Sequence, residues 1–264
     1  MYIYSENFFG LKVSNFSETD LKIFIQKAFE NKNSKIFYGY SLAVLSYLRK
    51  YPGYYKTTSQ FDLIVTDGRL FYILARAFGI NLQYDISIPR LTILTLNILN
   101  ENKLKLLLVG GNKDTNILAN NNIRIEFSNI DIIEGIDGYN GIKDRKFLFD
   151  YVIKTKPNLI LLGLPTPLKQ ELALELRPLI DNCVIIPCGG MINVFAGKEK
   201  LTPIWLKKIG LASLYRHIQH PKRLPELFSI YFKTVTVFGY CAYLKFIKKQ
   251  PNISIPHIID KTNS

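Results

Sequence analysis

The sequence predicts an α/β protein with a Rossmann-like, mostly parallel sheet and helices on both faces, followed by a basic, aromatic, helical C-terminal appendage. Two observations lead to this prediction. Short apolar runs alternate with helical patterns as far as residue 187. Each run is continuously apolar rather than alternating, as strands covered on both faces are. Because parallel strands need a crossover connection, the helices between the runs favour a parallel sheet.

The expected strands are the runs 36–40, 62–66, 104–109, 123–127, 159–162 and 184–187. The expected helices are 41–50, 69–78, 90–100, 113–121, 143–154 and 168–176. The rhythm of strands and helices stops after residue 197. We therefore expect an α/β catalytic domain at 1–197 and a C-terminal appendage at 198–264.

The positive charge is concentrated in this appendage. The whole chain of 264 residues carries +13, and from Lys198 onward twelve Lys and Arg stand against three acids. A block of this kind indicates an anionic partner, such as a nucleic acid, a membrane surface or a phosphorylated ligand, unless it is simply a solvated surface. Aromatic residues lie between the lysines, which favours a bilayer interface. We expect an anionic membrane surface and no nucleic acid, although base stacking keeps nucleic acid as an alternative.

The expected location is the cytoplasm, with peripheral attachment to the inner face of the membrane. The N-terminus lacks the pattern of a secretory signal, and the three cysteines do not form a disulfide framework or a zinc site. The uncharged run 234–244 is too short to span a bilayer, and a core-packed helix is an equal alternative for it. The sequence leaves a homo-oligomer open.

Asp67 is the first candidate for chemistry, because it ends the run DLIVTD where parallel strands present ligand sites. Its carboxylate is either a general base or the N-cap of the helix that follows at Gly68. The turns at Gly68, at Gly110 and Gly111, and at Gly189 and Gly190 also follow strands and are candidates for substrate binding. Such glycines let backbone amides approach a diphosphate, and they also serve ordinary turns.

Two further groups are candidates for substrate binding. Gln170 and Glu171 open the helix 168–176, where an amide is placed to bind a uracil or a sugar hydroxyl and a glutamate suits the helix dipole. Arg216 and Arg223 are candidates to stabilise a diphosphate leaving group, with solvated surface charge as the alternative. No metal site and no cofactor are expected.

In their order and spacing these segments resemble the WecG/TagA/CpsF family, glycosyltransferase family 26. The resemblance covers most of residues 36–230 and is carried by VTDGRL (65–70), LLVGG (107–111), GLPTPLKQE (163–171), CGGMINVFAGKEKLTPIW (188–205) and LYRHIQHPKR (214–223). It implies an inverting, metal-independent transfer of N-acetylmannosamine, a uronic acid or a related hexose. The donor is a UDP-sugar and the acceptor is linked to undecaprenyl diphosphate. The implied base is Asp67, and Gln170, Arg216 and Arg223 are implied site residues.

The sequence also departs from the family pattern. Asp85 stands where the family has an arginine and Arg90 where it has an acid, which suggests an exchanged charge pair. Glu226 replaces a later arginine. These departures support a second hypothesis, in which the chain binds a sugar nucleotide or a polyprenyl lipid without turnover, as an assembly component.

Overall fold

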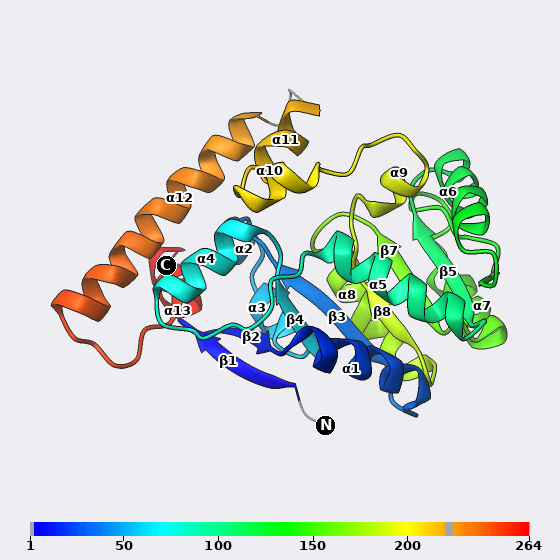
Figure 1. Cartoon of the computed structure of the whole chain (residues 1–264), viewed down its shortest axis with the longest axis horizontal. Helices are drawn as coiled ribbons and strands as arrows, with labels where there is room; N and C mark the ends of the chain where they lie inside the picture. Colours follow the sequence, from blue (N-terminus) through cyan, green and yellow to red (C-terminus); the bar gives the residue numbers. More distant parts are fainter. Residues whose placement is uncertain (1–2, 220–223, 264) are drawn as a thin grey trace.

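A six-stranded parallel sheet forms the centre of the molecule, as predicted (Figure 1). The computed structural model describes residues 3–219 and 224–263. The strand order is β4-β3-β8-β7-β5-β6, and each neighbouring pair is parallel. The strands are β3 (Lys35–Tyr40), β4 (Leu63–Thr66), β5 (Lys105–Gly110), β6 (Asp131–Ile132), β7 (Leu159–Gly163) and β8 (Val184–Ile186).

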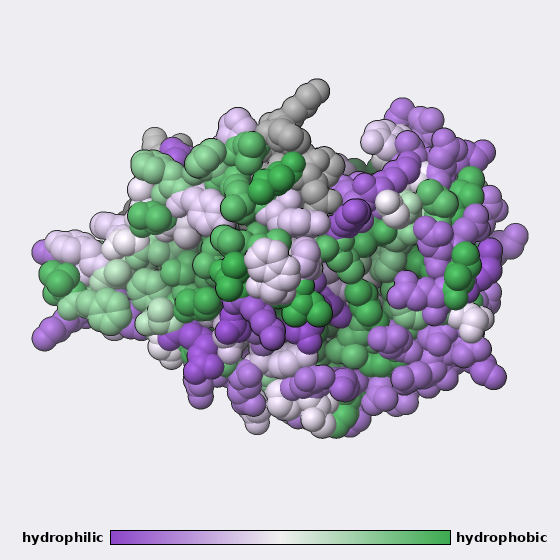
Figure 2. All heavy atoms as spheres, turned by 45° about the horizontal axis from the view of Figure 1, so that its top comes forward, coloured by the Kyte–Doolittle hydropathy of each residue, from purple (hydrophilic) through white to green (hydrophobic). Residues whose placement is uncertain are grey.

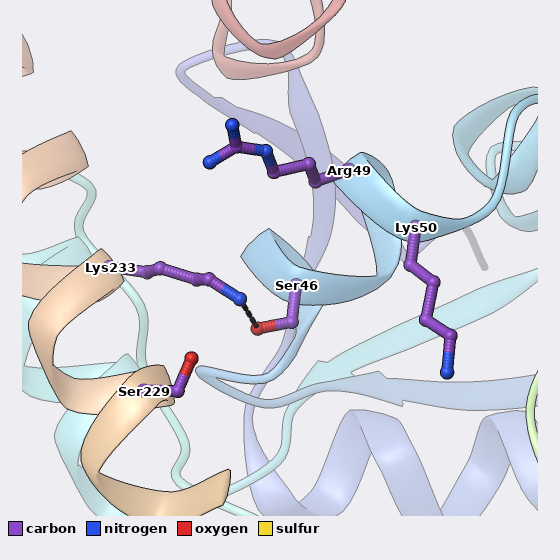
Figure 3. Close-up of a pocket in the computed structure, with 5 residues that line it drawn as sticks. All are labelled: Ser46, Arg49, Lys50, Ser229 and Lys233. Atoms are coloured by element: carbon purple, nitrogen blue, oxygen red, sulfur yellow. Dashed lines mark hydrogen bonds between the residues drawn. The ribbon is translucent and has the colours of Figure 1, made fainter. Parts of the chain in front are cut away.

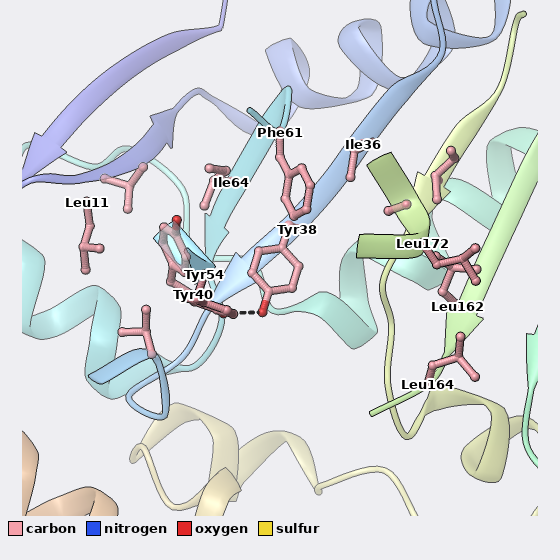
Figure 4. Packing of buried hydrophobic residues seen from close by; sticks show 14 of the residues in the cluster. Leu11, Ile36, Tyr38, Tyr40, Tyr54, Phe61, Ile64, Leu162, Leu164 and Leu172 are labelled. Carbon is pink, nitrogen blue, oxygen red and sulfur yellow. Dashed lines mark hydrogen bonds between the residues drawn. The ribbon is translucent and has the colours of Figure 1, made fainter. Parts of the chain in front are cut away.

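Both faces of the sheet are covered, which explains why its strands read as continuous apolar runs. In β5, Leu107 and Val109 belong to one hydrophobic core, and Leu106 and Leu108 belong to the other. All four side chains are fully buried. Figure 4 shows part of the first core, where side chains of the strands meet those of α8.

Two groups of helices bury apolar side chains in these two cores. The first core receives α2 (Val44–Lys50), α3 (Tyr54–Thr58), α4 (Arg69–Ala77), α7 (Arg145–Thr155) and α8 (Leu168–Leu176). The second core receives α1 (Glu18–Glu30), α5 (Ile88–Glu101), α6 (Lys113–Glu126) and α9 (Met191–Phe195).

The prediction of a strand at 123–127 was wrong, because this run is the end of α6 and the first residue after it. The side chain of Asn112 caps the helix by accepting a hydrogen bond from the Thr115 N–H at 2.9 Å. Ala119 and Ile123 are buried at a spacing of four residues, whereas Ile125 is 81% exposed. This is the periodicity of a helix with one buried face.

An N-terminal hairpin was not expected from the sequence. Its strands β1 (Tyr4–Phe8) and β2 (Leu11–Asn15) are antiparallel. The Ser14 hydroxyl accepts a hydrogen bond from the Ile64 N–H at 2.9 Å, which ties β2 to β4. The hairpin therefore lies next to the edge strand β4 and extends the apolar surface of the sheet on that side.

The C-terminal appendage is helical, as predicted. It contains α10 (Ile204–Lys208), α11 (Ala212–Gln219), α12 (Leu224–Ala242), the π-helical turn η3 (Tyr243–Ile247) and α13 (Ile255–Asn263). Phe238 of α12 stacks on Phe8 of the hairpin with ring centroids 5.4 Å apart, and Ile255 of α13 is fully buried. The appendage therefore shares the first core, and the division at residue 197 stays a prediction.

The uncharged run 234–244 lies within a longer helical stretch. Leu227–Ile247 form a continuous helical stretch of 21 residues that is long and apolar enough to cross a membrane by length and composition. Lys233 and Lys245 interrupt the uncharged run but not the helix. Its buried side packs on the rest of the protein, and its outer side carries exposed Phe228, Phe232 and Val235.

Candidate active site

A cavity of about 1330 Å³ lies at the carboxyl ends of β3, β4 and β8. Ligands of open α/β sheets bind at such strand ends. The strand ends contribute Ser41, Asp67, Gly68, Cys188 and Gly190 to its wall. The appendage contributes residues of α10 and α12, among them Lys207, Ile230 and Tyr231. The cavity is therefore bounded jointly by the α/β domain and the appendage.

Asp67 is held firmly at the wall of this cavity. Its N–H continues the β3–β4 ladder by donating to the Tyr40 carbonyl at 2.8 Å. Its Oδ1 accepts a hydrogen bond from the Ile88 N–H at 3.0 Å, at the first residue of α5. Among the described residues, no hydrogen bond to its Oδ2 is found. One carboxylate oxygen thus holds the start of α5, whereas the other has no partner in the described part of the chain.

The alternative in which Asp67 caps the helix after it was wrong. Gly68 occupies the N-cap of α4 with φ of 112°, and no side chain caps this helix. The carboxylate instead serves α5, a helix that begins more than twenty residues later. The left-handed φ of Gly68 turns the chain so that Asp67 faces across to α5.

Gly39 makes room for Asp67 on the neighbouring strand. A Cβ atom on Gly39 would lie 2.8 Å from the Asp67 Cβ and 2.8 Å from the Ile88 Cγ1. Both distances are below van der Waals contact, so any side chain at residue 39 displaces the carboxylate or the start of α5. The position of Asp67 therefore depends on the absence of a side chain at residue 39 of β3.

Several cations line the cavity with Asp67, among them Lys207 and Arg90. Lys207 of α10 is half-buried, and Arg90 lies in the first turn of α5. Burial lowers the pKa of Lys207, the charge of Arg90 lowers it further, and the charge of Asp67 opposes both effects. The Lys207 ammonium therefore lies close enough to Arg90 and Asp67 to interact electrostatically with both.

The two exchanged charges at residues 85 and 90 do not pair with each other. Asp85 accepts a hydrogen bond from Arg69 Nη1 at 3.0 Å. Arg90 Nη2 donates to the Tyr84 hydroxyl at 3.2 Å, and its guanidinium lies 5.8 Å from the centre of that ring. All four residues line the cavity. Asp85 and Arg90 therefore each interact with a different residue at the rim of the cavity.

Of the predicted glycines, Gly68 and Gly190 line the cavity and Gly110, Gly111 and Gly189 do not. Gly110 has φ of 137°, and a Cβ there would lie 2.5 Å from the Gly163 carbonyl oxygen on β7. Its role in the structure is the close approach of two strands. Diphosphate binding by Gly110, Gly111 and Gly189 stays a prediction.

Gln170 is completely buried and does not line the cavity. Its Nε2 donates to the Tyr38 hydroxyl at 2.8 Å, and that hydroxyl also bonds the Tyr54 hydroxyl at 2.7 Å (Figure 4). Burial raises the pKa of Tyr38 far above its ordinary value, so the phenol stays neutral. Within the described part of the chain Gln170 Oε1 has no partner. Its neighbour Glu171 is exposed on α8, and binding of substrate by either residue stays a prediction.

The side chains of the two predicted arginines fall outside the described residues. Arg216 belongs to α11, but its side chain is outside the described residues, and Arg223 lies outside them entirely. Across the described residues, no group of three His, Cys, Asp or Glu side chains is arranged to hold a metal ion.

The sequence prediction did not single out Lys207 and Gly39. Lys207 was counted only as part of the basic block, because its approach to Asp67 depends on how α10 folds over the sheet. Gly39 offered a weak signal as a glycine inside the apolar run 36–40, where glycine marks a close approach of another part of the chain.

An exposed apolar stripe runs along the outer side of α12. We call Phe228, Phe232, Val235, Tyr243 and Phe246 the outer stripe. They are spaced by three, four or eight residues, or one to two helical turns, on the side opposite to the buried residues. Figure 2 shows that the side of the molecule over α12 is largely apolar, whereas the opposite end over α6 and α7 is largely hydrophilic. Such a patch marks an interaction surface.

The sequence matches a known protein family along most of its length. The model of the family described as "Glycosyl transferase WecG/TagA/CpsF family" matches residues 6–252. A relative from Bacillus subtilis (strain 168), named N-acetylglucosaminyldiphosphoundecaprenol N-acetyl-beta-D-mannosaminyltransferase, is 28% identical over 70% of this chain and 71% of its own length. A relative from Shigella boydii, named UDP-Gal:alpha-D-GlcNAc-diphosphoundecaprenol beta-1,4-galactosyltransferase, is 30% identical over 74% of this chain and 85% of its own. The chain therefore belongs to the WecG/TagA/CpsF family of glycosyl transferases.

Proposed function

We propose that this protein is an inverting glycosyltransferase that moves a hexose from a UDP-sugar to a sugar carried on undecaprenyl diphosphate. The observation that carries the proposal is Asp67, a fixed carboxylate in a large cavity at the strand ends. The names of the two relatives support the acceptor, and one of them names a UDP-sugar as donor. The transferred sugar is proposed to be N-acetylmannosamine, a uronic acid or a related hexose such as galactose.

In the proposed reaction Asp67 is the general base. Its Oδ2 takes the proton of an acceptor hydroxyl as that oxygen attacks the anomeric carbon of the donor. The new carbon–oxygen bond forms while the bond from the anomeric carbon to the diphosphate breaks, and UDP leaves with the electron pair. The hydrogen bond from Ile88 to Oδ1 keeps the carboxylate oriented during this step.

Lys207 and Arg90 are proposed to stabilise the leaving diphosphate. Both cations line the cavity, and the lowered pKa of Lys207 reflects an environment in which its charge lacks full solvation. A diphosphate supplies the compensating negative charge, and fixed cations act most strongly on charge that develops in a site with little water. Independence from a metal ion is part of this proposal and is testable by chelation.

The outer stripe is proposed to hold the enzyme on the inner face of the membrane, where a polyprenyl acceptor resides. Along α12 and η3 its aromatic residues are accompanied by Lys233 and Lys245, a composition suited to the bilayer interface. Because α10 and α12 also line the cavity, the same appendage links the membrane surface to the site.

The test is turnover by purified protein with a panel of UDP-sugars and a short-chain polyprenyl-diphosphate acceptor carrying N-acetylglucosamine. We expect release of UDP and a disaccharide product whose new linkage has the opposite anomeric configuration to the donor. Activity that persists with excess EDTA supports independence from metal. Absence of turnover with every donor, together with saturable binding of a UDP-sugar, would instead favour the non-catalytic assembly component.

A further inference from the structure

A second, smaller cavity lies on the other side of the contact between α2 and α12. Its volume is about 360 Å³, and the lining residues that the structure describes are hydroxylic or cationic: Ser46, Arg49, Lys50, Ser229 and Lys233. Lys233 reaches from α12 and donates to the Ser46 hydroxyl at 3.3 Å (Figure 3). Arg49 extends from α2 toward α12, and Lys50 extends on the other side of Ser46 (Figure 3).

This cavity is separate from the candidate active site. The two share no lining residue among those described. Helix α2 turns Tyr47 to the large cavity, which Ala43 at its N-cap also lines, and turns Ser46, Arg49 and Lys50 to the small one. Helix α12 likewise divides its residues, with Ile230 and Tyr231 in the large cavity and Ser229 and Lys233 in the small one. A ligand of the small cavity therefore does not compete with the reacting sugars.

The small cavity lies beside the outer stripe. Ser229 and Lys233 each follow a stripe residue, Phe228 and Phe232, by one position. Adjacent helix positions differ by about 100° around the axis, so these two polar side chains flank the stripe along one edge. When the stripe lies in the apolar part of the interface, its polar edge is at the level of the headgroups.

We propose that this cavity binds the phosphate group of an anionic phospholipid and so fixes the orientation of the appendage on the bilayer. A phosphate is the group that two hydroxyl donors and adjacent Arg and Lys side chains recognise together. The proposal rests on the proposed membrane attachment and adds a defined site to it. It commits to a bilayer lipid, because the apolar stripe at the edge of the cavity has no role toward a phosphate in solution.

The test distinguishes general electrostatic attraction from specific binding of the phosphate in the cavity. Binding is measured by cosedimentation with vesicles of phosphatidylcholine, with and without phosphatidylglycerol. The double variant Ser46→Ala/Ser229→Ala leaves the net charge unchanged and is expected to weaken binding to anionic vesicles about tenfold, as loss of hydrogen bonds to a charged group does. Lys233→Gln is expected to weaken it more than the matched control Lys249→Gln. That control removes one exposed charge from the same appendage, which alone lowers binding about fivefold.

The outcomes separate this proposal from the ones before it. Failure of the unaltered protein to bind anionic vesicles overturns both the attachment and the lipid site. Equal binding by the serine double variant and the unaltered protein, or equal losses for Lys233→Gln and Lys249→Gln, overturns the lipid site alone. In every case, turnover of a short, water-soluble acceptor tests the transferase by itself.

Discussion

Replacement of Asp67 by Asn separates its chemical role from its structural one. The amide keeps an oxygen at the place of Oδ1, so it still accepts the hydrogen bond that Ile88 donates at 3.0 Å. We expect the free energy of unfolding to change by less than about 1 kcal/mol, which is the size of the lost interaction between a carboxylate and a helix N-terminus. The amide cannot take a proton, so the transfer rate is expected to fall about 10² to 10⁴-fold.

Replacement by Ala gives the contrasting result. Asp67→Ala removes the acceptor and leaves the half-buried Ile88 N–H without its partner, which costs about 1–3 kcal/mol of stability. Initial rates of UDP release and thermal unfolding are measured for both variants, with the exposed Asp181→Asn as control. An Asp67→Asn enzyme that retains more than about a tenth of the rate refutes the role as base. Equal destabilisation by Asn and Ala refutes the assignment of Oδ1.

Four further predictions address the surroundings of the site. Gly39→Ala is expected to lower the free energy of unfolding by about 1–3 kcal/mol through overpacking, and to lower the turnover rate as well, as measured by denaturant unfolding and initial rates. Unchanged kinetics would contradict the role of Gly39 in the site. Lys207→Met is expected to raise the unfolding temperature at pH 7 and to lower kcat/KM about 10²-fold. In the unaltered protein, the free energy of unfolding should rise with pH between the lowered pKa of Lys207 and its usual pKa of 10.5, because the unfolded state binds more protons in that range. Burial raises the pKa of Cys188 to about 12, so its labelling by iodoacetamide at pH 8 should require unfolding, and fast labelling of the native protein contradicts this. Phe232→Asp, at a 72% exposed position, should abolish vesicle binding without changing stability, whereas Ile125→Asp on α6 should leave binding intact.

Local patterns were sufficient for most of the fold. The runs that became β3, β4, β5, β7 and β8 are apolar at nearly every position because both faces of the sheet are covered, and that signature does not depend on the partner strands. The prediction at 123–127 failed because Arg124 and Glu126 interrupt this run, so it lacks the continuously apolar character of a strand covered on both faces. The capping side chain of Asn112 and the helical spacing of Ala119 and Ile123 determine the outcome.

The sequence predicted a site residue correctly only where its position relative to a single strand was sufficient to place it. Asp67 follows a buried strand, so its position at the strand ends followed from the sequence. Its contact with the N-terminus of α5 did not, because residues 67 and 88 meet only when α5 crosses the sheet. Gln170 looked like a ligand on the same logic, yet its side chain turns inward to Tyr38, a residue far away in the chain.

The sequence by itself determined the class of fold, the position of Asp67 and the basic, aromatic character of the appendage. These properties depend on the pattern and composition of neighbouring residues. Tertiary structure alone decided that Gly39 makes room for Asp67, that Lys207 shares its cavity, and that α2 and α12 enclose a second, cationic cavity. Each of these depends on contacts between residues distant in the chain, and no local pattern encodes where such residues meet.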